Sequence, residues 1–268
     1  MSCLSDFQSL SGGYTHQNYR LRYTPSNAPP IQCVVRLPHR ELSEHQRVSF
    51  RWELDYLQSL GSQRLPVCEV LGAHVLTGIL LTRWYDGQHL HRVSGSSAAA
   101  CMQRIEDALA QLPAQTRRYD PLAQLSQLDS TPSWIRRLAS SCANWLDGQD
   151  AQLRPCHNDL NPYNLLCSEA GDAALVILDW EMAGLNHPGF DLVTAHVGLA
   201  RERVGDEPTA RAALQQRLGQ ETAAWLLCCY WLREWAWAMA QLAAGNRLEA
   251  VQDQASLALR ELQVLTPN

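Results

Sequence analysis

CHNDLNPYNLL, at residues 156–166, and VILDWEMAGLNHPGFDLV, at residues 176–193, are the two stretches that decide which fold this chain is expected to adopt. Two short apolar runs, residues 164–167 and 174–178, have the composition of strands and are joined by a turn sequence. The sequence therefore predicts a hairpin. This hairpin would return the chain so that Asp179, directly after the second strand, faces the loop that precedes the first strand.

The polar residues in these stretches have the spacing of a phosphoryl-transfer site. His157, Asp159 and Asn164 form the pattern H-x-D-x-x-x-x-N, and Asp179 follows Asp159 by twenty residues. Phosphoryl transfer requires a carboxylate that accepts a proton from the attacking hydroxyl, and oxygen ligands that hold Mg²⁺ against nucleotide phosphates. The pattern assigns the first role to Asp159 and the second to Asn164 and Asp179.

The N-terminal part of the chain has the alternation of β-strands and contains one helical segment. Strands are predicted over residues 18–23 and 31–37, and again over residues 67–73 and 75–84. Between these pairs, residues 41–60 carry apolar side chains at helical spacing. This order predicts an antiparallel sheet with a helix on one side.

The rest of the chain is predicted to be mainly helical apart from the hairpin. One helix is expected to begin within residues 94–97, another lies within residues 132–148, and the pattern is helical from Asp191 onward. The sequence therefore predicts an α+β fold with two lobes. The small β-rich lobe, which would bind the nucleotide, is residues 1–86, and the larger, mainly helical lobe, which would hold the catalytic residues and the acceptor, is residues 87–268.

The composition excludes several classes of protein. The chain contains no lysine, so all 22 of its Lys and Arg residues are arginine. A Walker-type P-loop and a pyridoxal-phosphate site both require lysine and are therefore excluded. The net charge of −5, from 22 basic and 27 acidic residues, argues against a nucleic-acid partner, which needs a basic surface.

The cysteines and the apolar segments suggest a compartment. None of the nine cysteines is in a C-x-x-C pair, so zinc ribbons and thioredoxin-like redox sites are not supported. The N-terminal segment MSCLSDFQSL lacks the features of a signal peptide, and the apolar residues 223–244 are interrupted by Arg233 and Glu234. We therefore expect free thiols, a cytoplasmic location and no membrane partner.

The two stretches resemble the catalytic core of the aminoglycoside phosphotransferase superfamily, which includes choline and thiamine kinases. The resemblance implies a protein-kinase-like fold, Mg²⁺ as cofactor and ATP as co-substrate. It implies that Asp159 is the catalytic base and that His157 shapes the catalytic loop. It also implies that Asn164 and Asp179 bind the metal and that Asp191 steadies the loop from a helix start.

The resemblance extends to the N-terminal part of the chain. Gly12 and Gly13, in the segment LSGG, are similar to the family's nucleotide-covering loop, although an ordinary turn explains them as well. Arg36, in the segment VVRLPH, stands where protein kinases have a phosphate-binding lysine, as in some small-molecule kinases. The expected acidic partner of Arg36 is Glu53, with Glu44 as the alternative.

The acceptor is expected to be a small cationic metabolite with a primary alcohol. The chain is most similar to bacterial thiamine kinases in its length and in the segments LSGG and VVRLPH, so thiamine is the first expectation and choline or ethanolamine the alternative. Glu181 and His187 are predicted to border the acceptor, and Trp231 and Trp235 to offer rings for cation–π contacts. The i, i+4 spacing of the two tryptophans more often marks a packed helix face.

Three other functions agree with parts of the sequence. A non-catalytic, pseudokinase-like binding module would be expected to lack Asp159, Asn164 or Asp179, and all three are present. A metal-dependent hydrolase would need more imidazole ligands near the metal than His157 and His187 supply. An aminoglycoside or amino-sugar phosphotransferase of the same fold would favour a more acidic cleft, and it stays an alternative for the acceptor.

Overall fold

The computed structural model describes residues 3–10, 16–93, 95–167, 175–202 and 207–265. The chain forms two compact units, each built from two segments. Unit 1 comprises Met1–Pro113 and Tyr163–Glu181, and unit 2 comprises Ala114–Pro162 and Met182–Asn268. The functional boundary expected at residues 86 and 87 stays a prediction.

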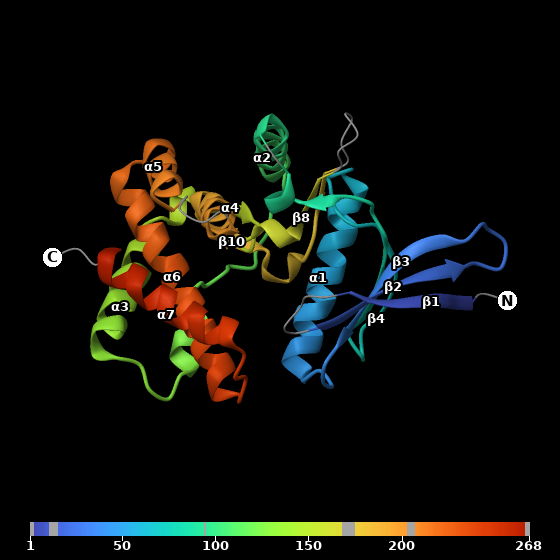
Figure 1. The fold of residues 1–268 in the computed structure, drawn as a ribbon, viewed down its shortest axis with the longest axis horizontal. Helices are drawn as coiled ribbons and strands as arrows, with labels where there is room; N and C mark the ends of the chain where they lie inside the picture. The colour runs from blue at the N-terminus through green and yellow to red at the C-terminus, as the bar shows by residue number, and fades with distance from the viewer. Residues whose placement is uncertain (1–2, 11–15, 94, 168–174, 203–206, 266–268) are drawn as a thin grey trace. The chain divides into compact units, whose positions relative to one another are not determined.

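The larger sheet of unit 1 is antiparallel and has the strand order β1-β2-β3-β5-β4. Its strands are β1 (Cys3–Leu10), β2 (His16–Thr24), β3 (Ile31–Pro38), β4 (Val70–His74) and β5 (Ile79–Arg83). Figure 1 labels β1, β2, β3 and β4. Buried Leu21, Cys33 and Val35 form the core of this sheet. Strand β3 lies between β2 and β5, and Arg36 is in register with both of them. The sheet therefore fixes the backbone of Arg36 from two sides.

Helix α1 (Glu44–Ser62) corresponds to the helical segment predicted over residues 41–60. It begins later than predicted because Ser43 forms a capping box with Gln46. Ser43 Oγ accepts from the Gln46 backbone N–H at 3.3 Å, and Gln46 Oε1 accepts from the Ser43 N–H at 2.9 Å. The buried residues of α1 are Phe50, Glu53, Tyr56, Leu57 and Leu60. One carboxylate, that of Glu53, thus lies on the buried face of this helix.

The predicted hairpin forms a second, smaller sheet in unit 1. Strand β8 (Leu165–Cys167) pairs antiparallel with β9 (Leu175–Ile177) and with β6 (Gln88–His89). Residues 168–174, which include the predicted turn, lie outside the described part of the chain. The Ile177 N–H donates to the carbonyl oxygen of Pro66 at 2.7 Å, which ties the hairpin to the segment after α1. The helices η1 (Leu90–Arg92) and α2 (Gly95–Leu109) follow β6.

Unit 2 is mainly helical. Its helices are η2 (Ala123–Gln127), α3 (Ser133–Asp147), η3 (Asp150–Gln152), α4 (Gly189–Glu202), α5 (Glu207–Leu218), α6 (Gln220–Ala243) and α7 (Glu249–Leu265). Pro132 and Gly148 flank α3, as the sequence predicts. Strands β7 (Arg154–Cys156) and β10 (Gly184–Asn186) pair antiparallel. The short helices η4 (Pro162–Asn164) and η5 (Trp180–Met182) lie where the chain passes from one unit to the other.

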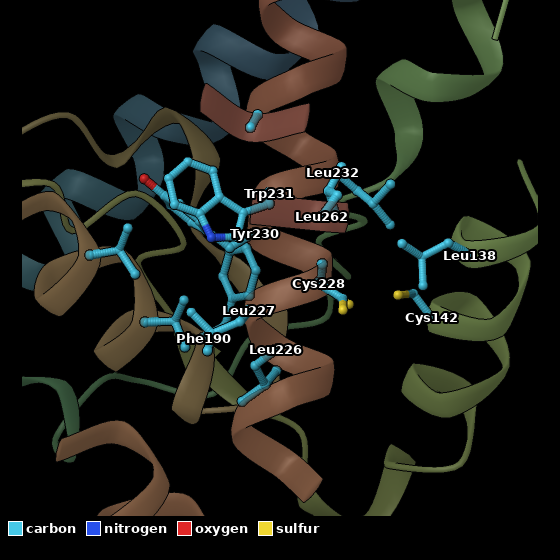
Figure 2. Packing of buried hydrophobic residues seen from close by; sticks show 14 of the residues in the cluster. Leu138, Cys142, Phe190, Leu226, Leu227, Cys228, Tyr230, Trp231, Leu232 and Leu262 are labelled. Carbon is cyan, nitrogen blue, oxygen red and sulfur yellow. The ribbon is translucent and has the colours of Figure 1, made fainter. Parts of the chain in front are cut away.

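Helix α6 is the centre of the hydrophobic core of unit 2. Residues of α3, α4, α5 and α7 belong to the same buried cluster. Figure 2 shows Cys228 of α6 facing Cys142 of α3, whereas Phe190 of α4 lies on the other side of α6. Trp231 and Trp235 are 2% and 4% exposed and are part of this cluster. Because α6 is covered on several sides, its sequence is apolar nearly all round.

The α+β class expected from the sequence is confirmed, with a small antiparallel sheet in unit 1 and a helical unit 2. Four strands were not predicted: β1, β6, β7 and β10. The side chains of β1 are mostly exposed, and the other three strands have only two or three residues, so no apolar period marks them. Over the described ranges, we find no helix with the length and apolar character needed to cross a bilayer.

Candidate active site

Asn164 and Asp179 flank the open end of the β8–β9 hairpin. Leu165 lies opposite Ile177 in the register of the two strands. The pairing continues by one bond, in which the Leu178 N–H donates to the carbonyl oxygen of Asn164 at 2.8 Å. The two residues predicted to bind metal are fifteen positions apart in the chain, yet they adjoin the same backbone hydrogen bond.

Asp179 has an unusual backbone conformation. Its φ of 58° lies in the left-handed region, which residues other than glycine seldom adopt, although Asp and Asn tolerate it best. Its side chain is 40% exposed, and Oδ1 lies 3.5 Å from Nη1 of Arg36. A strained backbone that presents a solvent-accessible carboxylate is typical of functional sites.

Arg36 forms a two-pronged ion pair with Glu53 of α1. Nη1 donates to Oε1 at 2.9 Å and Nη2 donates to Oε2 at 2.5 Å, with the side chains 13% and 3% exposed. The structure thus pairs Arg36 with Glu53. Oε2 of Glu44, the alternative partner considered for Arg36, lies 3.9 Å from Nη1 of Arg47. Burial would lower the pKa of Arg36, but the surrounding carboxylates, chiefly that of Glu53, outweigh it and raise that pKa. The guanidinium is therefore permanently charged, as phosphate binding requires.

We call Arg36, Glu53 and Asp179 the Arg36 triad. Glu181, in η5, is half-buried, and its charge also raises the pKa of Arg36. The acidic residue predicted to meet a cationic acceptor therefore belongs to the same electrostatic environment as the triad. The predicted nucleotide-covering residues Gly12 and Gly13 lie outside the described residues.

In unit 2, residues 157–159, which we call the Asp159 loop, are held by Asp191 of α4. Asp191 Oδ2 accepts the backbone N–H of His157 at 2.9 Å, and Oδ1 accepts that of Asn158 at 2.6 Å. Asp191 is 2% exposed, and burial raises its pKa to about 7, against the lowering effect of these two bonds. Asp191 thus bonds two consecutive backbone N–H groups of the loop, and its loop-steadying role stays a prediction.

Asn158 fixes the shape of the loop from inside. Its φ of 69° lies in the left-handed region, as does that of Asp179, and its side chain is fully buried. Nδ2 donates to the carbonyl oxygen of Met182 at 3.1 Å, and Oδ1 accepts from Nδ2 of Asn186 at 2.8 Å. The buried amide thus stabilises a backbone conformation that would be costly without these bonds.

Asp159 itself is partly accessible, with a side chain 29% exposed. Its Oδ2 accepts from Nδ2 of Asn161 at 3.1 Å, and its Oδ1 lies 3.5 Å from Nη2 of Arg233. The Asp159 N–H donates to Nδ1 of His157 at 3.2 Å, and the His157 side chain is fully buried. His157 therefore contacts the loop backbone, and the loop-shaping role that the resemblance implies for it stays a prediction.

His187 is engaged at both ring nitrogens. Its Nδ1 accepts the N–H of Gly189 at 3.1 Å at the start of α4, and its Nε2 lies 3.2 Å from Oε1 of Gln152. The residue is 6% exposed, and burial lowers the pKa of its ring. These contacts favour a positioning role at the start of α4, and acceptor binding by His187 stays a prediction.

Trp231 and Trp235 of α6 lie in the hydrophobic core of unit 2. Trp231, labelled in Figure 2, packs edge-on against Tyr230 with ring centroids 5.0 Å apart. Acceptor binding by the two tryptophans also stays a prediction. Their burial favours the alternative that the sequence left open, a packed helix face.

Three residues of the site escaped the sequence analysis: Asn158, Asn186 and Arg233. Asn158 occupies the x position of the H-x-D motif, to which the motif assigns no role. Arg233 offered a signal, because a charged residue inside an apolar helix is costly unless it is paired. Its partner, the loop around Asp159, lies too far away in the sequence to be identified from that signal.

The oxygen donors of unit 1 suit a magnesium ion. Asn164 offers an amide oxygen and Asp179 an accessible carboxylate, the hard ligands that Mg²⁺ prefers. Over the described residues, no group of three or more His, Cys, Asp or Glu side chains is arranged as a metal site. Mg²⁺ commonly uses one or two protein carboxylates together with water and substrate phosphates.

Comparisons with known proteins show the family to which the chain belongs. A model described as the phosphotransferase enzyme family matches residues 6–228. Protein LicA of Haemophilus influenzae is 27% identical over 206 residues, which cover 70% of this chain and 56% of LicA. The chain therefore spans little more than half the length of that curated relative.

Solved structures share the fold. Choline kinase LicA from Streptococcus pneumoniae has a TM-score of 0.69 and 15% identity, covering 97% of this chain and 94% of its own. A thermostable mutant of aminoglycoside phosphotransferase APH(4)-Ia, in a ternary complex with ADP and hygromycin B, has a TM-score of 0.66 and 16% identity, covering 98% and 93%. At these identities the likeness concerns the fold, which is the protein-kinase-like one that the sequence resemblance implied.

Proposed function

The chain belongs to the phosphotransferase enzyme family, and from this premise we propose that it is a kinase that transfers phosphate from ATP to the primary alcohol of a small cationic metabolite. The observation that carries the proposal is the Arg36 triad. It combines a guanidinium held by a buried carboxylate with a second, accessible carboxylate 3.5 Å away. A cation for phosphate oxygens beside an acid for Mg²⁺ is the pair that phosphoryl transfer needs.

We assign the roles as follows. Arg36 binds phosphate oxygens of the nucleotide, and Glu53 keeps its guanidinium in place. Asp159 orients the acceptor hydroxyl and accepts its proton. Asn164 and Asp179 would hold Mg²⁺, which would neutralise charge on the phosphates. Gly12 and Gly13 cover the nucleotide, and Glu181 offers a negative charge to the cationic part of the acceptor.

For the acceptor we propose two candidates. Choline is favoured by the likeness to LicA in sequence and to choline kinase LicA in fold. Thiamine, the expectation from the sequence, is supported by the LSGG and VVRLPH segments. Both combine a primary alcohol with a permanent positive charge, but only thiamine adds flat rings that can stack.

The test is an ATP-dependent assay with choline, thiamine, ethanolamine, an amino sugar and hygromycin B. Product is identified by its added phosphate in mass spectrometry, and initial rates are compared at sub-saturating acceptor. A tenfold preference in kcat/KM corresponds to about 1.4 kcal/mol of transition-state discrimination. We expect one cationic alcohol to exceed the others by at least that factor. Equal rates for choline and thiamine would agree with the proposed kinase activity but contradict the expected preference for one acceptor.

A binding module without activity is the rival from another class, and the same assay separates it. Such a protein would bind ATP without releasing acceptor-dependent ADP. The Asp159→Asn variant provides the blank for the assay, and Asp129→Asn, which changes an exposed carboxylate of the same unit, is its matched control. Nucleotide binding with the same background rate in wild type and Asp159→Asn, for every acceptor, would favour the binding module.

A further inference from the structure

Arg233 of α6 contacts the Asp159 loop at two points. Its Nη1 donates to the carbonyl oxygen of Asn158 at 2.6 Å, and its Nη2 lies 3.5 Å from Oδ1 of Asp159. The side chain of Arg233 is 13% exposed. One guanidinium therefore holds both the backbone before Asp159 and the carboxylate of Asp159.

The guanidinium of Arg233 is itself fixed from several directions. Nε and Nη2 donate to Oε1 of Glu234 at 3.1 and 2.9 Å. The aromatic rings of Phe190 and Tyr230 lie 5.5 and 5.2 Å from the guanidinium carbon, within the range of cation–π contacts. Burial would lower the pKa of Arg233, but nearby Tyr119, Glu234 and Asp159 outweigh it, so the pKa is raised well above its ordinary value. The charge of Arg233 is permanent.

Glu234 is braced in turn by α7. Its Oε2 accepts from Nε2 of Gln254 at 2.6 Å and lies 3.6 Å from Nη1 of Arg201. Gln254 is 5% exposed and accepts a short hydrogen bond from Arg201 through Oε1. In Figure 1, α7 runs beside α6, so the chain of contacts leads from the Asp159 loop through α6 to the next helix.

We propose that Arg233 is a positioning residue for Asp159: it sets the carboxylate against the acceptor hydroxyl, and Glu234 with Gln254 sets Arg233. This inference rests on the proposed function and extends it. A buried arginine with no role in the site would be an expensive way to stabilise the core, since an apolar side chain of similar volume serves as well or better. The hydrogen bond from Arg233 to the carbonyl oxygen of Asn158 indicates that the charged side chain serves to position the loop.

Arginine fits this role and lysine does not. The contacts of Arg233 run in different directions, to a carbonyl oxygen, to Asp159 and to Glu234, and they use three nitrogens. An ammonium on a single stem cannot reproduce that planar fork. Arg233→Lys therefore keeps the charge but loses the geometry, and it distinguishes the two contributions.

The experiment is a double-mutant cycle that combines Arg233→Gln with Asp159→Asn, measured on the full chain with the best acceptor found. We expect Arg233→Gln to lower kcat about 10–100-fold with KM for ATP changed less than twofold, and Arg233→Lys to recover part of kcat. In the Asp159→Asn background, Arg233→Gln should cost less than a further twofold, because the residue that it positions is already absent. Arg211→Lys is the matched control, because Arg211 forms a partly buried ion pair with Glu261 in the same unit.

A second measurement does not depend on turnover. Amide hydrogen exchange in a peptide covering residues 156–162 should become about tenfold faster in Arg233→Gln, because one strong loop bond is lost, and should not change in Arg211→Lys. If Arg233→Gln does not fold, Glu234→Gln, which removes the brace and leaves the contact to Asp159, should lower kcat and speed exchange by a smaller factor.

The outcomes separate the inference from the proposed function. A full additive loss of kcat in the Asp159→Asn background, or unchanged exchange in the loop, would overturn the role of Arg233 while leaving the kinase intact. Unchanged kcat in Asp159→Asn itself would overturn the assignment of the base, and the positioning role would fall with it.

Discussion

The Arg36 triad in unit 1 and the Asp159 loop in unit 2 both fix a carboxylate, but they do so with different kinds of bond. In the triad, side chains bond to side chains: Arg36 joins Glu53 on a helix to Asp179 after a strand. In the loop, side chains also bond to the backbone: Asp191 accepts two N–H groups, and Arg233 donates to a carbonyl oxygen in addition to its ion pair with Asp159.

This difference determines what a substitution does. Removing a member of the triad changes charge where the phosphates are expected, and the strands keep their own ladder bonds. Removing a backbone-binding partner frees the loop, so the position of Asp159 changes with it. Triad variants should therefore act mainly on KM for ATP, and loop variants mainly on kcat and stability.

The largest effect is expected at the end of the loop. Asp159→Asn should lower kcat about 10²–10⁴-fold, the usual contribution of a general base, while the melting temperature and the affinity for ATP stay near wild type. Steady-state kinetics and thermal unfolding measure this, with Asp129→Asn as control. Wild-type turnover in a folded Asp159→Asn protein would contradict the assignment.

Asp191→Asn tests whether backbone bonding controls the loop. An amide offers one acceptor oxygen in place of two, so one of the N–H groups of His157 and Asn158 loses its partner. We expect kcat to fall up to about 10²-fold through misplacement of Asp159, and the free energy of unfolding to fall by about 1–3 kcal/mol. A loss of stability with unchanged kcat would show that the loop does not depend on this bond.

Arg36→Lys tests the triad. Lysine cannot bond both oxygens of Glu53 and still offer a fork to phosphate, so KM for ATP should rise about tenfold with a smaller change in kcat. Arg22→Lys is the matched control, because Arg22 lies on the neighbouring strand in an exposed ion pair with Asp6. Equal KM values for wild type and Arg36→Lys would mean that another residue holds the phosphates.

The two regions should also differ in their dependence on pH. Burial raises the pKa of Asp191 to about 7, whereas an unfolded carboxyl titrates near 4. Between about pH 4 and 7 the folded chain binds a proton that the unfolded chain releases, so this group favours folding at the acid end and less so as pH rises.

Activity should follow the opposite course, falling a few-fold from pH 8 to pH 6. A protonated Asp191 presents an O–H to one of the two backbone N–H groups and loses that bond. Unfolding curves and kcat are measured for wild type and Asp191→Asn across this range. The variant should lack both trends, and a trend that persists in it would assign the titration to another group.

The smallest effect on activity is expected from the tryptophans of α6. Trp231→Phe should lower the free energy of unfolding by about 0.5–3 kcal/mol, because it leaves space in the core, with KM for the acceptor within twofold of wild type. Denaturant unfolding and acceptor titration check this. A large rise in acceptor KM with unchanged stability would restore the predicted aromatic contact.

What the sequence predicted well depends on local chemistry. Pro132 and Gly148 bound α3 because they act on their own backbone, and the hairpin was identified from adjacent apolar runs. Glu53 was chosen as the partner of Arg36, and the ion pair is present. In each case the deciding residues are neighbours in the chain or carry opposite charges.

What the sequence did not predict depends on bonds between a side chain and a distant backbone. Arg233 donates to the carbonyl oxygen of Asn158. Because every residue has a backbone carbonyl, the residue type at position 158 does not predict this contact. The i, i+4 spacing of Trp231 and Trp235 has the same form in an aromatic binding site and in a core helix covered on several sides. Only the packing around the two tryptophans distinguishes an aromatic binding site from a buried helix.

The division of unit 1 into two segments has a consequence for the order in which the protein can fold during synthesis. The chain leaves unit 1 after Pro113 and returns at Tyr163. During synthesis, the segment that ends at Pro113 emerges before β8 and β9. Strand β6 and the Pro66 carbonyl oxygen therefore have no bonding partners from the hairpin until the first part of unit 2 has been translated. The five-stranded sheet of unit 1 can form early, but the hairpin that precedes Asp179 pairs with β6 only after β9 (Leu175–Ile177) has been made.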